Sequence, residues 1–254
     1  MDRREHILEV ARRDGRITVE ALSAELGVSP HTIRRDINQL CEEAKLRRLH
    51  GGAEFIGDRI NWPYGQRAVL HYEAKRRIAA AVAAEVPDNA SVFISIGSTP
   101  ALVAEALAAH DGLTVITNNM NAALALSVNM SNRIILPGGE LRLPDLDFID
   151  STATRVFTSY RADFAIYGVG GVETDGSLLD FHEPEVRARE LMRHNARQSI
   201  LVADRSKFLR RATAVGGWIH DADLVVIASL PDPAYQPLLR DLRGRLIVSR
   251  EAAA

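Results

Sequence analysis

The spacing of apolar residues near the N-terminus predicts three short helices and a hairpin. Residues 1–13 and 18–26 each place aliphatic side chains on one side, as an amphipathic helix does. A third helix is expected over residues 30–41, with Ser29 as its N-cap and a proline at its first position. Residues 45–53 have the pattern of a strand that enters a Gly-Gly hairpin turn.

Further along the chain the pattern changes to short apolar runs that alternate with helical segments. Helices are expected at residues 73–85, 100–109 and 121–128. Strands are expected at residues 91–96, 113–116, 133–136, 163–167, 200–203 and 224–228. Strands that alternate with helices form a mostly parallel sheet with helices on its faces, so the fold class is predicted to be α/β.

These patterns divide the chain into three segments. Residues 1–56 are predicted to form a winged helix-turn-helix domain. Residues 57–72 lack clear periodicity and contain a proline and two glycines, so they are interpreted as a linker. Residues 73–254 are predicted to form the mostly parallel α/β domain.

Composition and charge narrow the class of protein. The 254 residues are 46% hydrophobic and 25% charged, and the net charge of −2 does not by itself indicate a nucleic-acid binder. No apolar run is long enough for a transmembrane helix and the N-terminal segment lacks a secretory stretch, so we expect no membrane contact and a cytoplasmic location. Cys41 is the single cysteine and the eight histidines are scattered, so neither a disulfide, a metal site nor a cofactor is expected.

The predicted third helix has an aliphatic side and a polar side. The aliphatic side comprises Ile33, Ile37 and Leu40. The polar side and its flanks comprise His31, Thr32, Arg34, Arg35, Asn38 and Gln39. Because a guanidinium group can bind guanine or phosphate with two hydrogen bonds, Arg34 and Arg35 suit this helix to the major groove of DNA. The alternative is an amphipathic helix whose charged residues only face solvent.

The hairpin that follows offers further groups to DNA. The residues expected to reach the adjacent backbone or the minor groove are Arg47, Arg48, His50, Gly51 and Gly52. Asp36 falls near the core side of the third helix, and we expect it to pair with a neighbouring group rather than to meet DNA.

The Ser-Ile-Gly-Ser-Thr-Pro segment at residues 95–100 has the features of a phosphate site. Gly97 permits a close turn, and Ser98 and Thr99 offer hydroxyl groups. The helix that follows begins at Pro100 and presents free N–H groups, which bind anions. The alternative is an ordinary strand-to-helix turn capped by hydroxyl groups.

Polar or glycine-rich loops also follow the other predicted strands. Since the carboxyl ends of parallel strands share one edge of a sheet, these loops are expected to converge on one ligand site. The candidate ligand residues are Ser95, Gly97, Ser98, Thr99, Asn118, Asn119, Gly138, Gly139, Gly170 and Lys207. Lys207 offers a positive charge to a phosphate, although a surface lysine beside a turn is the alternative.

Two stretches near the N-terminus resemble the DeoR family of bacterial repressors. They are residues 28–40, VSPHTIRRDINQL, and residues 49–53, LHGGA. The likeness extends to the effector domain of that family, which is related to sugar-phosphate isomerases. The segments that carry it are residues 97–100, 117–121, 133–142, 175–179, 185–187 and 206–208. The similarity to the glycerol-3-phosphate regulon repressor branch implies that glycerol 3-phosphate releases the protein from DNA, and it adds Glu185 to the candidate ligand residues.

The resemblance also implies partners. They are operator DNA, a phosphorylated small-molecule effector and other copies of the chain in a homo-dimer or homo-tetramer, because one winged helix-turn-helix recognises few base pairs. Two positions depart from the family pattern: Ser95 stands where the family usually has Asp, and Asp150 stands near a position that is usually Gly. Asp150 would repel a phosphate or form different loop contacts. These departures leave another sugar phosphate or phosphorylated polyol open as the effector.

A sugar-phosphate isomerase with an added DNA-binding domain is the rival interpretation. Such an enzyme needs a carboxylate base, for which Glu183, Glu185 and Asp163 are candidates by position. An acid at a helix N-terminus explains the two glutamates and a turn before a strand explains Asp163. The chain shows neither a paired acid and base nor a nucleophile motif, so we predict a sensor and not an enzyme.

Overall fold

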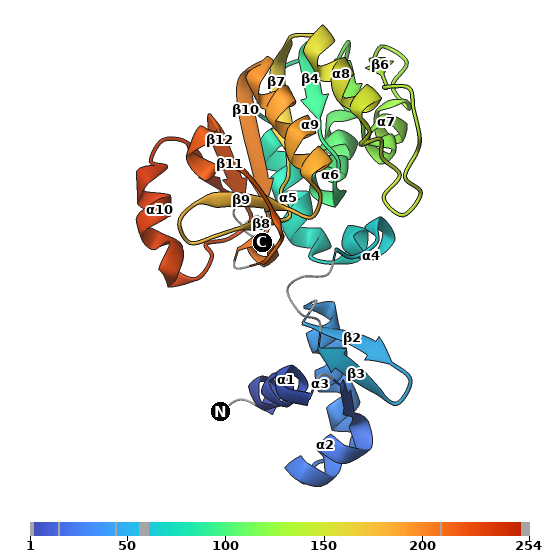
Figure 1. Ribbon diagram of the computed structural model, residues 1–254, viewed down its shortest axis with the longest axis vertical. Coiled ribbons are helices and arrows are strands. Elements are labelled where there is room, and N and C mark those ends of the chain that lie inside the picture. Colours follow the sequence, from blue (N-terminus) through green and yellow to red (C-terminus); the bar gives the residue numbers. More distant parts are fainter. Residues whose placement is uncertain (1–2, 15, 44, 56–60, 209, 250–254) are drawn as a thin grey trace. The chain divides into compact units, whose positions relative to one another are not determined.

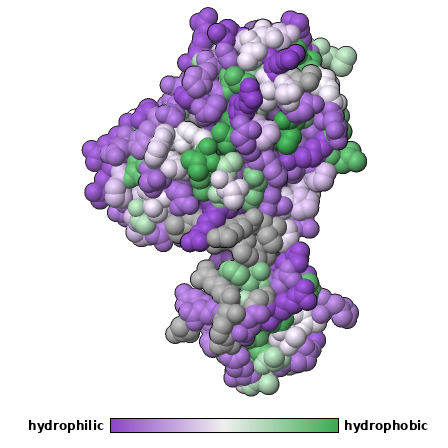
Figure 2. Space-filling model, viewed as in Figure 1, coloured by the Kyte–Doolittle hydropathy of each residue, from purple (hydrophilic) through white to green (hydrophobic). Residues whose placement is uncertain are grey.

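The computed structural model describes residues 3–14, 16–43, 45–55, 61–208 and 210–249, and the chain divides into two compact units (Figure 1). The first unit is Met1–Ile60 and the second is Asn61–Ala254. Among the residues described, no helix combines the length and the apolar character needed to cross a membrane. Hydrophilic residues cover most of the face of each unit that Figure 2 shows.

The described part of the first unit folds as three helices and a three-stranded antiparallel sheet. The helices are α1 (Arg3–Asp14), α2 (Val19–Leu26) and α3 (Pro30–Glu42). The strands, in sheet order, are β1 (Arg16–Thr18), β3 (Gly52–Phe55) and β2 (Leu46–Leu49). Their apolar side chains form one core, in which Ile7, Leu22, Ile33 and Leu46 are almost fully buried. These elements confirm the winged helix-turn-helix fold expected from the sequence.

Local side-chain contacts explain where the helices of this unit begin. The Ser29 hydroxyl accepts a hydrogen bond from the Thr32 N–H at 3.2 Å, as expected of the N-cap of α3. The Thr18 hydroxyl caps α2 in the same way. Between the two helices Gly27 adopts φ 64°, a left-handed conformation that glycine enters without strain.

The hairpin turn lies one residue earlier than the Gly-Gly pair suggested. His50 and Gly51 form the turn, and Gly52 is the first residue of β3. A Cβ atom on Gly52 would lie 2.0 Å from the carbonyl oxygen of Ile17 in β1, so only glycine lets these two strands pair.

A seven-stranded sheet, parallel at every strand pair, forms the centre of the second unit. Its order is β13-β12-β10-β7-β4-β5-β6. The strands are β4 (Ser91–Ile94), β5 (Thr114–Thr117), β6 (Arg133–Ile135), β7 (Ala162–Tyr167), β10 (Ala196–Ala203), β12 (Leu224–Ile227) and β13 (Leu246–Val248). The α/β class and the mostly parallel sheet are thereby confirmed.

Helices cover both faces of this sheet (Figure 1). One layer contains α5 (Tyr72–Ala83), α6 (Ser98–Leu107) and α7 (Met120–Leu126). The other contains α8 (Ser151–Ser159), α9 (Glu183–His194) and α10 (Gln236–Asp241). Val92 and Ile94 of β4 pack into the first layer and Phe93 packs into the second. Burial on both faces explains why the strands appear as continuous apolar runs in the sequence.

A second, antiparallel sheet was not foreseen. Its order is β11-β9-β8, from β8 (Gly171–Val172), β9 (Ser177–Asp180) and β11 (Ala214–Trp218). The C-terminal part of the chain also contains short 3-10 helices: η1 (Arg205–Lys207), η2 (Ile219–Asp221) and η3 (Pro233–Tyr235). β8 has only two residues, β9 is buried at every position, and the burial pattern of β11 does not alternate strictly, so no period of two marks these strands in the sequence.

The interpretation of residues 57–72 as a linker needs correction. Residues 57–60 lie outside the described residues, but residues 61–72 belong to the second unit and contain the helix α4 (Tyr64–Val69). None of the side chains of α4 is fully buried, so no apolar period marks it in the sequence.

Candidate functional site

The polar face of α3 is exposed, as expected of a surface that could meet DNA. Ile33 and Ile37 are completely buried, whereas Arg34 and Arg35 are exposed on the other side of the helix. Within the described residues no hydrogen bond or ion pair holds either guanidinium group. His31 and Asn38 are exposed on the same face, and Thr32 is partly exposed.

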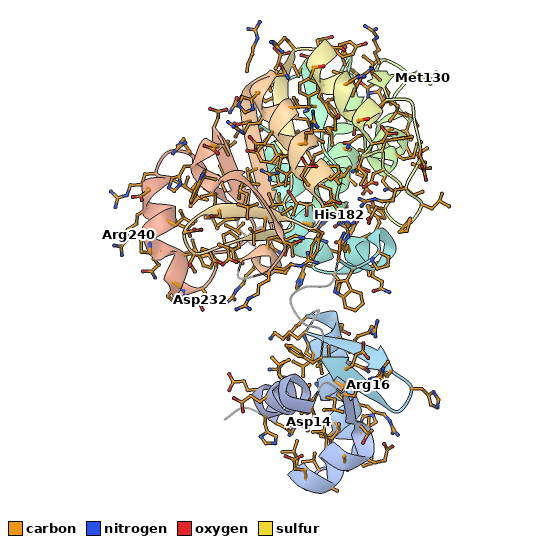
Figure 3. All side chains as sticks on the ribbon, viewed as in Figure 1. Asp14, Arg16, Met130, His182, Asp232 and Arg240 are labelled. Carbon is orange, nitrogen blue, oxygen red and sulfur yellow. The ribbon has the colours of Figure 1, made fainter. Side chains whose placement is uncertain are left out.

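The two hairpin arginines point to opposite faces of β2, because side chains alternate along a strand. Arg48 donates from Nη1 to Asn38 Oδ1 and so joins the hairpin to α3. Arg47 pairs with Glu54, its cross-strand neighbour, and this carboxylate also pairs with the exposed Arg16, which is labelled in Figure 3.

Two expectations near these residues can be compared with the structure. Asp36 accepts hydrogen bonds from Nε and Nη2 of Arg3, which confirms the local pairing. Gly52 was expected to touch DNA, but it is buried against β1, so its role is in packing. His50 and Gly51 remain exposed at the turn.

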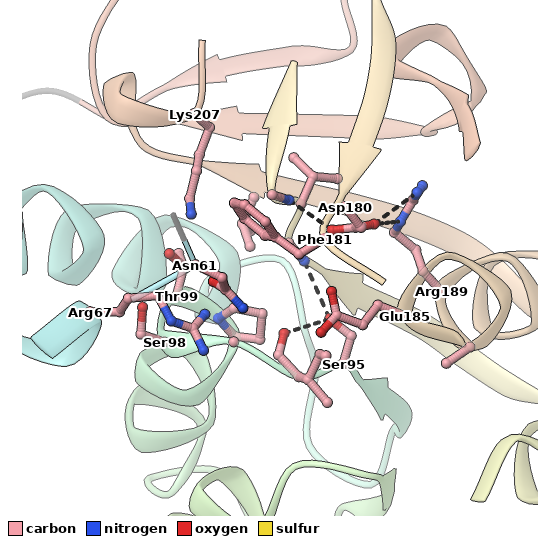
Figure 4. Close-up of a pocket in the computed structure, with 18 of the residues that line it drawn as sticks. Asn61, Arg67, Ser95, Ser98, Thr99, Asp180, Phe181, Glu185, Arg189 and Lys207 are labelled. Atoms are coloured by element: carbon pink, nitrogen blue, oxygen red, sulfur yellow. Dashed lines mark hydrogen bonds and ion pairs between the residues drawn. The ribbon is translucent and has the colours of Figure 1, made fainter. Parts of the chain in front are cut away.

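The second unit contains a pocket at the carboxyl edge of the large sheet (Figure 4). Its volume is about 680 Å³ including its open mouth. Eight of the eleven candidate ligand residues line it: Ser95, Gly97, Ser98, Thr99, Asn118, Gly170, Glu185 and Lys207. The loops therefore converge as parallel-sheet topology requires.

The N-terminus of α6 forms one wall of this pocket. Gly97 precedes the helix with φ 115°, a conformation open to glycine, and no side chain caps the helix. In the part of the chain that the structure describes, the N–H groups of Ser98 and Thr99 have no protein acceptor. Asn119 lies behind the pocket, where its Nδ2 donates to the carbonyls of Ser95 and Gly97 at 3.1 and 3.2 Å. It shapes the loop rather than lining the site.

Positive charge gathers at this end of the pocket. Lys207 and Arg67 of α4 line the pocket here, and Figure 4 shows Lys207 extending toward the segment with Ser98 and Thr99. Arg210 also lines the pocket, with its guanidinium group over the Phe181 ring. Burial, together with the charge of Arg210, lowers the pKa of Lys207 to about 7, although Asp204 acts in the opposite direction. The cations thus outweigh the acids around Lys207, which favours an anionic ligand.

Lys75 of α5 supports the same wall from behind. It is 3% exposed, and its Nζ donates to the Ser98 hydroxyl at 3.0 Å and to the Arg67 carbonyl. Burial lowers the pKa of Lys75 to about 8, although the charge of Asp204 opposes the shift.

Carboxylates occupy the other end of the pocket (Figure 4). Asp180 of β9 accepts from the Gly170 N–H at 2.8 Å and pairs with Arg189 at 3.1 Å. Glu185 of α9 pairs with Arg142 at 2.9 Å. Burial raises the pKa of both carboxyl groups. The pocket therefore has a cationic end and an end rich in oxygen acceptors, which suits a ligand with an anionic group and hydroxyl groups.

The two departures from the family pattern have local explanations. The Ser95 hydroxyl accepts from the Gly168 N–H at 3.3 Å and donates to the Ile96 carbonyl at 3.1 Å, so it ties β4 to β7. Asp150 does not line the pocket. Its carboxylate accepts a hydrogen bond from the Ala153 N–H at 2.6 Å and caps α8. Of the two roles considered for Asp150, the structure therefore shows a different local contact.

Some predicted residues lie elsewhere, and some pocket residues were missed. Gly138 and Gly139 are exposed and outside the lining, whereas Arg142, later in the same loop, donates to Glu185 at 2.9 Å. Reasoning from the sequence did not find Asn61, Arg67, Phe181, Asp180, Arg189 and Arg210. The clearest signal available was the density of Arg and Lys in and beside the loop at residues 203–211.

The acids proposed for catalysis are occupied or distant. Asp163 accepts from the Ser91 N–H at 2.9 Å at the start of β7, at the edge of the sheet opposite the pocket. Glu183 is exposed and outside the lining, and Glu185 is held by Arg142. Among the described residues no three His, Cys, Asp or Glu side chains are grouped to hold a metal ion.

Both units match family models. Residues 3–59 match the DeoR-like helix-turn-helix domain and residues 70–229 match the DeoR C terminal sensor domain. The chain is 40% identical over 235 residues to the glycerol-3-phosphate regulon repressor of Escherichia coli (strain K12), covering 92% of this chain and 93% of that protein. It is 34% identical over 251 residues to the HTH-type transcriptional repressor CsqR of the same organism, covering 99% and 96%.

Solved structures add only a distant likeness. Ribose 5-phosphate isomerase A from Methanocaldococcus jannaschii aligns with 55% of this chain and 56% of its own, at a TM-score of 0.40 and 17% identity. That similarity is too low to bear on ligand or chemistry. The two family matches and the near full-length relatives establish that the chain belongs to the DeoR family of transcriptional repressors.

Proposed function

We propose that the protein represses transcription by binding operator DNA through α3 and that a phosphorylated polyol, glycerol 3-phosphate, releases it. The exposed Arg34 and Arg35 support the first half, because their guanidinium groups have the hydrogen-bonding geometry to read guanine or hold phosphate. Recognition by one such helix covers few base pairs, so the working form is a homo-dimer or homo-tetramer that reads a symmetric site in the cytoplasm.

The observation that carries the second half is the cationic end of the pocket. The free N–H groups of Ser98 and Thr99 line the pocket together with the side chains of Arg67 and Lys207. A helix N-terminus and two or more cations form a strong site for a phosphate dianion. The name of the relative that shares 40% identity over nearly the whole chain favours glycerol 3-phosphate as the ligand.

The opposite end of the pocket suits the hydroxyl groups of such a ligand. Glu185, Asp180 and Asn118 line it and present carboxylate and amide oxygens. A second candidate is another sugar phosphate, which would offer the same anionic group and further hydroxyl groups to these oxygens. Catalysis is disfavoured, because Asp180 and Glu185 are each held by an arginine and so are poorly placed to remove a proton from carbon.

Calorimetry tests the ligand assignment. Glycerol 3-phosphate should bind, and glycerol should bind far more weakly because it lacks the phosphate. Lys207→Ala removes a charge-assisted contact of about 1.5–3 kcal/mol, so affinity should fall roughly tenfold or more. Arg205→Ala is the matched control, since Arg205 lies on the same 3-10 helix but is exposed and outside the lining.

Two further comparisons refine the assignment. Equal binding of glycerol and glycerol 3-phosphate, or an unaffected Lys207→Ala, would remove the phosphate site from the proposal. Ser95→Asp restores the residue usual in the family. Tighter glycerol 3-phosphate binding by this variant would keep that ligand, whereas a preference for a different phosphate would favour the second candidate. Turnover of ribose 5-phosphate would revive the isomerase alternative.

A further inference from the structure

Polar contacts hold α4 against the cationic end of the pocket. Its six residues include no fully buried side chain, and a helix of this length is unstable on its own. The Arg67 guanidinium of α4 pairs with Asp145, and Lys75 of α5 donates to the Arg67 carbonyl. The Tyr64 N–H also donates to the Pro144 carbonyl at 3.1 Å. The position of α4 therefore depends largely on polar contacts with residues beside the pocket.

Arg67 has a hydrogen-bond donor left for a ligand. Its Nε donates to the Trp62 carbonyl at 2.7 Å and its Nη2 donates to Asp145. Within the described residues, Nη1 has no protein partner, and Arg67 lines the pocket. Figure 4 shows its guanidinium group beside Ser98, at the end where α6 begins. A phosphate at the α6 N-terminus would meet Nη1 without displacing the existing contacts.

The pocket and the residues behind it place like charges together. The charge of Arg67 lowers the pKa of both Lys75 and Lys207, after the larger effect of burial. Lys75 also joins Ser98 to α4, because its Nζ bonds to the Ser98 hydroxyl and to the Arg67 carbonyl. Arg67, Lys75 and Lys207 repel one another, and a bound anion would attract all three side chains. It would thereby hold α4 more firmly to α6.

A chain of ion pairs extends from Arg67 to the acidic end of the pocket. Asp145 lies 3.3 Å from Nη2 of Arg142, and Arg142 pairs with Glu185 at 2.9 Å. Both ends of the pocket are thus connected to the contact that positions α4. A ligand that spans the pocket would act on this network at both ends.

The sequence places α4 next to the DNA-binding unit. Asn61 directly follows Ile60, where the first unit ends, and only three residues separate that boundary from α4. Whatever fixes α4 also fixes the point at which the DNA-binding unit is attached. We propose that Arg67 binds the phosphate of the effector and that the resulting ordering of α4 is the step that lowers the affinity for operator DNA. This inference rests on the proposed function.

The test separates ligand binding from its effect on DNA. Operator DNA is first obtained by selecting bound sequences from a random library. Operator affinity is then measured without ligand and with saturating glycerol 3-phosphate, for the wild type, Arg67→Ala and Arg76→Ala. Arg76 is the control because it lies on α5 with a 68% exposed side chain and, among the described residues, pairs with its neighbour Glu73. Calorimetry with each protein sets the saturating concentration.

The wild type and Arg76→Ala should lose operator affinity by a similar factor on saturation, in the range of about 5–150-fold typical of such coupling. Arg67→Ala should bind glycerol 3-phosphate roughly tenfold or more weakly and, even when saturated, should lose operator affinity by less than about twofold. Full release of DNA by saturated Arg67→Ala would overturn the inference while leaving the proposed function intact. No binding of glycerol 3-phosphate to the wild type would overturn both.

Hydrogen exchange gives a second readout that needs no variant. The amides of residues 64–69 in the wild type should exchange more slowly when glycerol 3-phosphate is bound, and those of α10, which is remote in sequence and outside the lining, should not change. Unchanged exchange in α4 with the ligand bound would refute the ordering step even if Arg67→Ala does not fold.

Discussion

The affinity for the phosphate ligand should depend on pH in a way that the pocket lysines dictate. Burial and the charge of Arg210 lower the pKa of Lys207 to about 7, and burial lowers that of Lys75 to about 8. A bound dianion favours the charged amine, so it raises both pKa values and the complex takes up protons. Below pH 7 Lys207 is already charged. Above pH 7 the ligand must bind against the cost of protonating it.

The size of the effect follows from the fraction of charged Lys207. With a pKa of about 7 and a charged contact of about 1.5–3 kcal/mol, affinity should fall about threefold to fivefold between pH 7 and pH 8. The fall should level off at higher pH, where Lys207 is neutral both with and without the ligand. The second ionisation of a phosphate monoester, at about pH 6, gives an opposing rise on the acid side. Affinity should therefore peak between about pH 6 and pH 7.

Calorimetry across this range supplies the measurement. Titrations at pH 7 in buffers with different heats of ionisation should show uptake of about half a proton per ligand by Lys207. In Lys207→Met the falling limb should move to about pH 8, where Lys75 titrates. An affinity that stays flat or rises from pH 7 to pH 8.5, or a falling limb unchanged in Lys207→Met, would refute the reasoning.

Two predictions concern the DNA-binding unit. Arg34→Ala and Arg35→Ala should each weaken operator binding by about 1–3 kcal/mol in gel shifts if they contact bases, with no loss of helical circular dichroism; unchanged binding by the double variant would exclude α3 as the reader. Gly52→Ala should lower the melting temperature, because the new Cβ would lie 2.0 Å from a carbonyl oxygen of β1, whereas Gly65→Ala, with nothing within 4 Å, is the control. Equal melting of the two variants would contradict the packing role of Gly52.

Features that belong to a single element, such as its apolar period or its cap, could be predicted from the sequence. The N-cap Ser29 with the proline after it fixed the start of α3, and the aliphatic spacing fixed its buried side. Strands that alternate with helices predict a parallel sheet. The topology of such a sheet alone brings the loops after its strands to one edge, so the convergence of these loops could also be predicted.

Features that depend on contacts across the fold could not be predicted. Arg67 lies in a six-residue helix without a buried face, so no period distinguishes it from a linker. Asp180 reaches the pocket from a four-residue strand of the small antiparallel sheet, whose pairing with β11 spans a long sequence separation. Gly138 and Gly139 show the opposite error, since a glycine pair after a strand looks like a ligand loop whether or not the loop turns toward the pocket.

The net charge of −2 concealed both proposed anion-binding surfaces because acids and bases are distributed unevenly in space. In the first unit, Asp36 and Glu54 are paired with arginines away from the polar face of α3. That leaves Arg34 and Arg35 without a neutralising partner among the described residues. In the pocket, arginines likewise neutralise the carboxylates at one end, while Lys207 retains an excess of positive neighbours at the other. Affinity for phosphate, on DNA or on a metabolite, depends on such local excess, which only the folded chain creates.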